Sequence, residues 1–579
     1  MKRRVLFLLA FLVPGILPAR HSGFCQNPVG PESGSLILPV SIPVFLAGNF
    51  AEPRANHFHS GIDIKTNGST GIPVLSVADG TVSRIKIEAG GYGNALYVVH
   101  TNGYTSVYGH LQNFSHEIEE YVRAEQYRRE SFAVDLFPES SRFPVKKGQV
   151  IALSGNSGSS EGPHLHFELR ETSSENTINP LVKAYQLTDK TKPVIDKLYV
   201  FSLSGRQEWI KPVMVPLTQS GGTYKASSAS PVPMDQVCGF GLETWDLLDG
   251  SPNKCGVYRI QAFLDGMVFF DYVADEFAFS ETRFMNSFMD FKIFSSLRRP
   301  VLRLYIEPNN HLSMFSFSRN RGRIEVKDNN THTLKILIDD AAGNRSEAVV
   351  PVKLDPGKFV RDPDFLPVYN AYFSYNESNK YSSEGIAITV PPGSLYDDIY
   401  FQYEVRPARP GCYSLTHYVH KSDVPLQQYY RLAIEAAGLP EHLRSKATIA
   451  QFVGNGRYVS VGGTWEGNRL VSRSRNFGVF CIRTDTVSPV IRPLNFSNPD
   501  ELKTANSIRL TIRDDFPGIQ SYRAEIDGKW ALLEYDSKNN LFEYKMDPKR
   551  IGTGKEHTLA VRVSDQLNNK TTYTIRFYR

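Results

Sequence analysis

The stretches His59-Ser60-Gly61-Ile62-Asp63 and His164-Leu165-His166 decide the fold and the chemistry that we expect of this chain. Together they supply two imidazoles, one carboxylate and a spare imidazole. Three nitrogen and oxygen ligands leave the fourth tetrahedral position of a zinc ion open for water, which is typical of hydrolytic zinc and not of structural zinc. The two stretches therefore predict a hydrolytic metal centre.

The spacing within each stretch supports this prediction. Side chains at positions i and i+2 of a strand point to the same face, so an extended His164 to Arg170 would direct His164 and His166 into one cleft. His59 and Asp63, with Gly61 between them, are expected where a loop enters a strand. Taken alone, a His-x-His pair is more often two ordinary strand histidines, so only the combination of both stretches is predictive.

Length and composition predict several β-rich domains. A chain of 579 residues exceeds what one hydrophobic core supports, and about three to five domains are expected. Its 29 Tyr, 35 Phe, 43 Gly and 35 Pro favour strands and turns. A net charge of +5 is too weak to indicate nucleic-acid binding. It is equally compatible with binding to an anionic polymer of the cell wall.

The N-terminus has the pattern of a secretory signal. Met1-Lys-Arg-Arg precedes an apolar run over residues 5–17 that is too short for a stable transmembrane helix. We expect a signal peptide over residues 1–25 and an exported protein, in the periplasm or at the outer membrane or cell surface, with no transmembrane segment after cleavage. Lipidation at Cys25 stays open, because Phe24 is bulky where such sites take a small residue.

Four cysteines follow the predicted signal, an even number that permits disulfides in an exported protein. Nearness in sequence predicts pairing of Cys238 with Cys255 and of Cys412 with Cys481, although three connectivities exist. The Cys-x-x-Cys spacing is absent from the sequence, which argues against a cysteine zinc site.

Residues 36–185 are expected to form a compact antiparallel β domain. Residues 72–77, 81–87, 95–100, 105–108, 149–154 and 164–170 have the composition of strands bounded by turn residues. An insertion over about residues 115–145 interrupts them, and its charged first part predicts an amphipathic helix over residues 115–130. This helix is interpreted as a wall of the cleft or as a solvated decoration.

The remainder is expected to be a string of β modules, divided at residues 186–355, 356–483 and 484–579. Thr188-Asp-Lys-Thr-Lys-Pro-Val-Ile195 recurs as Thr484-Asp-Thr-Val-Ser-Pro-Val-Ile491, and the segment 332–344 recurs as 557–569. The matching order indicates two copies of one module, the first enlarged by insertions. Their strand and turn pattern predicts immunoglobulin-like β-sandwiches at 186–355 and 484–579, with another β-rich domain between them.

Several motifs in residues 36–185 carry a family resemblance: His59-x-Gly-x-Asp63, Gly91-Tyr-Gly-Asn94, Tyr108-Gly-His110-Leu, Val145-Lys-Lys-Gly-Gln149, Gly155-Asn-Ser-Gly158, Gly162-Pro-His-Leu-His-Phe167 and Asn179-Pro180. In combination they resemble the lysostaphin-type (LytM-like) zinc metallopeptidases, which are peptidoglycan endopeptidases. The long β-rich C-terminal tail is similar to that of secreted family members from Bacteroidetes-like bacteria.

The resemblance implies roles for five side chains. His59, Asp63 and His166 would bind one Zn²⁺ ion, with His110 and His164 as catalytic histidines. Zinc would lower the pKa of its bound water and polarise the scissile carbonyl, while the imidazoles handle protons and the oxyanion. His57 is an alternative ligand to His59, although the spacing to Gly61 and Asp63 favours His59. We interpret His100 and His116 as structural or exposed.

The implied substrates are stem or cross-bridge peptides of peptidoglycan. Gly91, Gly93 and Asn94 would form the edge of a shallow substrate groove, and a tight turn is the alternative interpretation of these residues. The expected function is zinc-dependent hydrolysis of peptide cross-links. Two alternatives stay open: a wall-binding or hydrolase-activating protein without catalysis on the same fold, and a surface scaffold or adhesin that acts through its β-sandwich tail.

Overall fold

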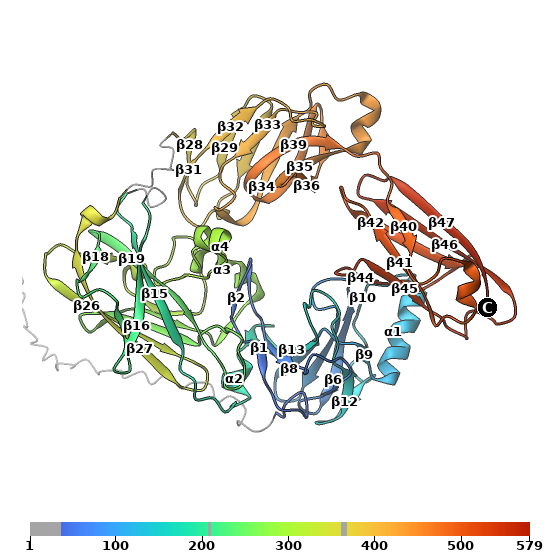
Figure 1. Ribbon diagram of the computed structural model, residues 1–579, viewed down its shortest axis with the longest axis horizontal. Coiled ribbons are helices and arrows are strands. Elements are labelled where there is room, and N and C mark those ends of the chain that lie inside the picture. Colours follow the sequence, from blue (N-terminus) through green and yellow to red (C-terminus); the bar gives the residue numbers. More distant parts are fainter. Residues whose placement is uncertain (1–35, 206–209, 361–367) are drawn as a thin grey trace, which may run out of the picture.

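The computed structural model describes residues 36–205, 210–360 and 368–579 (Figure 1). The predicted signal peptide and Cys25 lie outside the described residues. The fold is mainly β, with a compact antiparallel β domain that contains a helical insertion and several β-sheet modules after it, which confirms the predicted fold class. In the described part of the chain, no helix has both the length and the apolar character needed to cross a bilayer.

The N-terminal domain is built on one large antiparallel sheet. Its strands follow the order β1 (Leu46–Gly48), β4 (Ile62–Lys65), β13 (His164–Glu171), β8 (Tyr104–Gly109), β7 (Asn94–His100), β6 (Gly80–Ile87) and β10 (Val134–Leu136), with β11 (Pro144–Val145) and β14 (Thr177–Ile178) at the margins. A second sheet contains β5 (Pro73–Leu75), β12 (Val150–Leu153) and β9 (Asn113–Phe114), and β2 (Pro53–Arg54) pairs with β3 (His57–Phe58).

Strand alternation separates the core of this domain from its polar face. Ile62 and Ile64 of β4 and Leu165 of β13 are fully buried in the apolar core. The residues between them point to the opposite face, where Asp63 and His166 are direct neighbours in the β4–β13 register. One pair of central strands therefore fixes both the core and the position of two predicted metal ligands.

The helical insertion contains α1 (His116–Arg129), which begins after Ser115 and ends at Glu130. Its apolar residues Ile118 and Val122 are buried in the core of the N-terminal domain. The opposite end of the helix contacts the C-terminal module: the rings of Tyr127 and Trp530 meet edge to face with centroids 4.9 Å apart. The helix is thus part of a contact between distant parts of the chain.

Module A (residues 186–360) follows the N-terminal domain through α2 (Pro180–Lys183). Its main strands follow the order β23 (Leu302–Arg303), β19 (Val237–Trp245), β15 (Val194–Ser202), β16 (Val213–Ser220), β17 (Thr223–Ala226), β27 (Arg345–Leu354), β26 (Thr331–Asp339), β20 (Arg259–Leu264), β21 (Met267–Val273) and β24 (Phe315–Ser318). Shorter elements are β18 (Val232–Met234), β22 (Glu276–Phe277), β25 (Ile324–Glu325), α3 (Met285–Phe288) and α4 (Phe291–Leu297).

Module A and the N-terminal domain share sheet and core. Strand β22 of module A pairs with β14 of the N-terminal domain. Phe50, before the β2–β3 hairpin, and Phe58, in β3, are buried in the core of module A. They pack against Phe277 with ring centroids 5.3 and 5.5 Å away. The segment just before His59 is therefore anchored in the tail.

The middle module (residues 368–484) contains two five-stranded sheets and one β pair. The strands are β29 (Asn379–Ser383), β30 (Ile386–Val390), β34 (Pro425–Glu435), β38 (Arg469–Asn476) and β37 (Thr464–Glu466) in one sheet, β32 (Tyr403–Arg406), β33 (Thr416–Val419), β39 (Gly478–Thr484), β35 (Ala447–Gly454) and β36 (Arg457–Gly462) in the other, and the pair β28 (Ala371–Phe373) and β31 (Ile399–Phe401).

The C-terminal module (residues 485–579) consists of two four-stranded sheets. They are β40 (Val490–Pro493), β41 (Ser507–Arg513), β45 (Leu541–Lys545) and β44 (Glu534–Asp536), and β43 (Lys529–Trp530), β42 (Ile519–Ile526), β46 (Glu556–Asp565) and β47 (Lys570–Tyr578). The immunoglobulin-like character of the modules stays a prediction.

The four parts are arranged as a ring, so that the C-terminal module returns to the N-terminal domain (Figure 1). Arg523 pairs with Glu130 at 2.6 Å. Ser537 donates to the Ala89 carbonyl at 2.6 Å, and Lys538 donates to the carbonyls of Asn156 and Ser160. These contacts close the ring next to loops of the predicted substrate groove.

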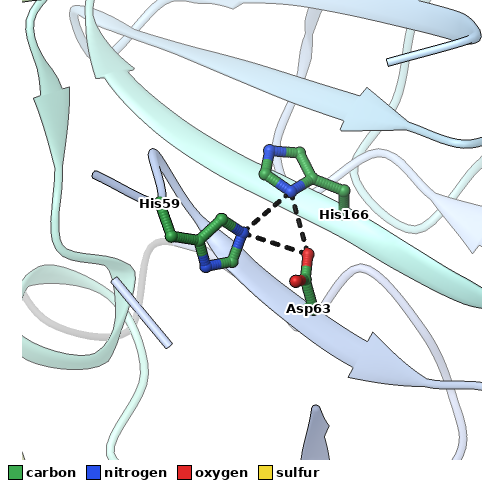
Figure 2. Close-up of side chains that lie close together, drawn as sticks. All are labelled: His59, Asp63 and His166. Atoms are coloured by element: carbon green, nitrogen blue, oxygen red, sulfur yellow. Dashed lines mark hydrogen bonds and ion pairs between the residues drawn. The ribbon is translucent and has the colours of Figure 1, made fainter. Parts of the chain in front are cut away.

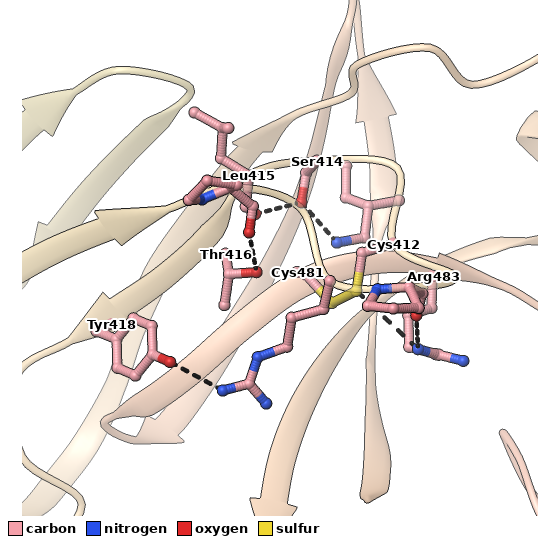
Figure 3. Close-up of a disulfide and its surroundings, with 11 residues drawn as sticks. Cys412, Ser414, Leu415, Thr416, Tyr418, Cys481 and Arg483 are labelled. Carbon is pink, nitrogen blue, oxygen red and sulfur yellow. Dashed lines mark hydrogen bonds between the residues drawn. A yellow bond between two sulfur atoms is a disulfide. The ribbon is translucent and has the colours of Figure 1, made fainter.

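The four cysteines within the described residues divide into one disulfide and two free thiols. Cys412 and Cys481 are joined in the middle module, as Figure 3 shows. The expected pairing of Cys238 with Cys255 is wrong, because both are buried free thiols. Cys238 lies near the start of β19, whereas Cys255 pairs through its backbone with Asp246, just beyond the end of that strand. Eight extended residues separate these positions by about 26 Å.

Candidate metal centre

Three predicted ligands converge on one point of the N-terminal domain (Figure 2). His59 Nε2 lies 3.1 Å from His166 Nδ1, and Asp63 Oδ1 lies 3.1 Å from the first nitrogen and 2.9 Å from the second. All three side chains are buried. Ligands about 2.0–2.1 Å from a tetrahedral zinc ion are separated by about 3.3 Å, so this triangle has nearly the size that such an ion needs.

Hydrogen bonds on the far side of each ring define which nitrogen faces the centre. The Asn49 carbonyl, 2.7 Å from His59 Nδ1, can only accept, so this nitrogen carries the proton. His166 Nε2 faces the Glu168 carboxylate at 2.9 Å in the same way. When both imidazoles are neutral, two unprotonated nitrogens and a carboxylate oxygen therefore face one another, and a bound cation satisfies all three. The donor set fits a zinc ion.

Glu168 is the centre of a buried network behind His166. Its side chain is fully buried, and its Oε1 also accepts hydrogen bonds from Ser60 Oγ and Tyr92 OH, each at 2.5 Å. Its Oε2 pairs with Arg170 at 2.6 Å. A carboxylate behind a metal-binding imidazole fixes the ring orientation and increases its basicity.

Arg54 holds the other oxygen of the Asp63 carboxylate. Its Nη2 donates to Asp63 Oδ2 at 2.6 Å, and its Nε lies 3.5 Å from Glu52. Since Oδ2 is occupied by the guanidinium, Asp63 offers Oδ1 alone toward the two histidines. Arg54 of the β2–β3 hairpin therefore leaves only one Asp63 oxygen for a metal ion.

His110 and His164 lie beside the three ligands. Their ring centroids are 4.7 Å apart, and His164 Nε2 lies 3.4 Å from Asp63 Oδ1. The carbonyls of Ser157 and Gly162 lie 2.9 and 2.8 Å from the Nδ1 atoms of His110 and His164, so both imidazoles leave Nε2 unprotonated when neutral. His110 adopts a φ of +57°, a conformation that is costly for a side chain of this size and that occurs often at functional sites.

The protein environment gives His59, His110 and His166 different pKa values. Burial lowers the pKa of His59 to about 4, and burial with the neighbouring imidazoles lowers the pKa of His110 to about 3. Burial also opposes protonation of His166, but hydrogen bonds to Asp63 and Glu168 outweigh it and raise its pKa to about 9. In the metal-free protein at pH 7, His110 is neutral and His166 carries the proton that a metal ion would displace.

The other histidines weighed in the sequence lie away from this centre. His57, the alternative ligand, is exposed on β3, and its Nδ1 contacts the Ala55 carbonyl. His100 is buried, and its ring nitrogens contact the Asp79 carbonyl and Ser106 Oγ. His116 is an exposed residue of α1.

Of the residues predicted to edge the groove, Gly91 and Gly93 lie in the turn between β6 and β7, and Asn94 is the first residue of β7. Gly91 and Gly93 adopt positive φ values of 51° and 65°. A Cβ atom on Gly93 would lie 2.4 Å from Ser157 Oγ, and the amide of Asn94 donates to the same hydroxyl. The glycines are required for this close approach of two loops, and their part in substrate binding stays a prediction.

Sequence reasoning missed several supporting residues: Asn49, Arg54, Tyr92, Glu168 and Arg170. Strand alternation contained a signal for two of them, because Glu168 and Arg170 continue the His164–His166 face of β13. Asn49 had no local signal. Its side chain forms two hydrogen bonds with the backbone of Gly256 in module A, 207 residues away.

Comparisons with known proteins agree with this geometry. Residues 57–127 and 140–180 match peptidase family M23, and residues 370–485 match a Zu5-like domain. An uncharacterized metalloprotease of Haemophilus influenzae is 37% identical over 123 residues, which are 21% of this chain and 20% of that protein.

Two further relatives have names that describe an activity. The DD-carboxypeptidase/endopeptidase Mpg of Neisseria meningitidis serogroup B is 35% identical over 19% of this chain and 20% of its own length. The murein hydrolase activator NlpD of Escherichia coli is 32% identical over 21% of this chain and 25% of its own length. The matched region thus spans about a fifth to a quarter of these relatives. The N-terminal domain, which places His59, Asp63 and His166 together on its sheet, thus contains the residues that match peptidase family M23.

Proposed function

We propose that this protein is a zinc-dependent endopeptidase that hydrolyses peptide cross-links of bacterial peptidoglycan. The observation that carries the proposal is the convergence of one ring nitrogen each of His59 and His166 with Asp63 Oδ1, beside two further histidines. His59, Asp63 and His166 would hold the ion. When bound, zinc supplies a Lewis acid for the scissile carbonyl and lowers the pKa of water.

The side chains of the site have separate tasks in this proposal. His164, with Nε2 directed toward the ligand cluster, takes the proton of the nucleophilic water. His110 is neutral at pH 7, so it donates to the oxyanion or the leaving amine only after it has gained a proton during the reaction. The turn that contains Gly91, Gly93 and Asn94 would edge the groove for the stem or cross-bridge peptide.

Export fits the disulfide of the middle module. Disulfides persist in oxidising compartments, and Cys412–Cys481 would be rare in a cytosolic protein. The relatives named Mpg and NlpD are named for peptidoglycan-related work, which supports a place in the cell envelope for this chain. We therefore propose the periplasm, the outer membrane or the cell surface as the site of action.

A non-catalytic activator is the second candidate, since one relative is named a murein hydrolase activator. The complete set of five site residues favours the enzyme. Purified zinc-loaded chain should release soluble muropeptides from sacculi of bacteria with an outer membrane, as detected by mass spectrometry, and His164→Ala should abolish the release while it retains zinc. Zinc binding without cleavage of several peptidoglycan chemotypes would favour the activator.

A further inference from the structure

A second group of metal-type ligands lies in module A. Asp189, Asp246 and Asp340 each place one carboxylate oxygen within 4.8 Å of the other two. They come from three separate segments: the linker before β15, the end of β19 and the end of β26. Asp246 and Asp340 are only 3% and 2% exposed.

One oxygen of this group has no hydrogen-bond partner. Asp246 Oδ1 is buried and unpartnered in the structure. In contrast, Asp340 accepts hydrogen bonds from the backbone and side-chain amides of Asn344, and Asp189 Oδ1 accepts from the amides of Thr191 and Asp249. A buried carboxylate oxygen without a hydrogen-bond donor is costly, and the two neighbouring carboxylates increase that cost.

The C-terminal module provides an internal comparison. Asp485, Asp514 and Asp565 form an equivalent group, and Asn569 bonds to Asp565 as Asn344 bonds to Asp340. Asp514 follows β41 as Asp246 follows β19. Asp514, however, is only half-buried, and its Oδ1 accepts a hydrogen bond from the Gly518 amide. The Gly518 amide therefore satisfies Asp514 in the second copy, whereas Asp246 Oδ1 of the first copy has no hydrogen-bond partner.

We propose that Asp189, Asp246 and Asp340 of module A bind a calcium ion. Three carboxylates from distant segments offer only hard oxygen ligands, which suit calcium and not zinc. The ion satisfies the orphaned Asp246 oxygen and replaces repulsion among the carboxylates with attraction. It also ties the linker that leaves the N-terminal domain to two strand ends of module A.

The site has a structural connection to the N-terminal domain. The backbone of Asp246 pairs with Cys255 through two hydrogen bonds of 2.9 Å. Gly256, the next residue, bonds to the side chain of Asn49, whose carbonyl holds His59. Calcium would therefore stabilise the loop over residues 246–256 against the N-terminal domain. This inference is independent of the proposed peptidase activity.

The test measures calcium binding by the zinc-loaded full chain in calcium-free buffer. Titration calorimetry with CaCl₂ should detect saturable binding below about 1 mM, and calcium should raise the unfolding temperature. Asp246→Asn should bind one calcium ion fewer than the wild type, and calcium should no longer raise its unfolding temperature. Without calcium, this variant should unfold at or above the wild-type temperature, because burial and the neighbouring Asp340 raise the pKa of Asp246 to about 8 and so make its charged form costly.

Asp514→Asn is the matched control, since it makes the same change at the equivalent position of the C-terminal module. It should retain the calcium equivalent that Asp246→Asn loses. Absence of calcium binding by the wild type, or equal calcium binding by wild type and Asp246→Asn, would overturn the proposal. The wild-type titration alone keeps the proposal testable if the Asp246 variant does not fold.

Discussion

Asn49 connects the tail to a predicted zinc ligand, and replacing it with alanine tests whether module A supports the metal centre. The Asn49 side chain accepts a hydrogen bond from the Gly256 amide at 2.8 Å and donates one to the Gly256 carbonyl at 2.7 Å. Its main-chain carbonyl orients His59 from 2.7 Å. Asn49→Ala removes both bonds to module A but leaves that carbonyl in place.

The structure sets the size of the effect. Two lost hydrogen bonds of about 0.5–1.5 kcal/mol each lower the free energy of unfolding by about 1–3 kcal/mol. If about 1.4 kcal/mol of this appears as looser positioning of His59, zinc affinity falls about tenfold. That decrease lies at the lower end of the 10–100-fold range typical of residues behind a metal ligand.

Competition between the protein and a chromophoric zinc chelator measures the affinity, and urea denaturation measures the stability. Asn253→Ala is the matched control. Asn253 lies in the loop that contains Gly256, the partner of Asn49, and its side chain accepts only a long 3.4 Å hydrogen bond from Ser251. We expect wild-type zinc affinity for this control. A zinc affinity of Asn49→Ala within about twofold of the wild type would refute the reasoning that module A positions His59.

Three further predictions concern the network, protons and ring closure. Glu168→Gln removes the buried charge partner of Arg170 and leaves it only the exposed Glu175, 3.3 Å away. Urea denaturation should therefore detect a loss of about 3–5 kcal/mol, and chelator competition should detect a 10–100-fold weaker zinc site. A loss of stability below about 1 kcal/mol would contradict this. Zinc binding displaces a proton from His166, whose pKa is about 9. The zinc affinity should therefore rise with pH toward pH 9, by up to about tenfold per pH unit. A zinc affinity that does not change between pH 6.5 and 8 would argue against this prediction. The double substitution Arg523→Glu and Trp530→Ala removes contacts between the C-terminal module and α1, so it should detach this module and increase the radius of gyration measured by small-angle scattering. An unchanged radius of gyration would show that these contacts do not keep the ring closed.

Sequence patterns predicted the N-terminal sheet and the proximity of His59, Asp63 and His166, whose role as metal ligands stays a prediction. Period-two alternation placed His164 and His166 on one face of a strand, and the strand exists as β13. The apolar spacing of Ile118 and Val122 predicted the inserted helix. These features depend on neighbouring residues, so a single sequence contains the information.

Features that depend on distant contacts could not be predicted in this way. Nothing in the sequence around Asn49 indicates that Gly256 is its partner. The pairing of Cys238 with Cys255 failed because nearness in sequence ignored the extended strand between them. The orphaned carboxylate of Asp246 likewise depends on segments that only the tertiary fold brings together.

Zinc content, measured by inductively coupled plasma mass spectrometry on chain purified without chelators, tests the central claim most directly. We predict about one zinc ion per wild-type chain and almost none in His166→Ala, because that variant removes one of three converging ligands. Wild-type protein without zinc, or a His166→Ala variant that retains a full equivalent, would contradict the metal centre and the peptidase proposal that depends on it.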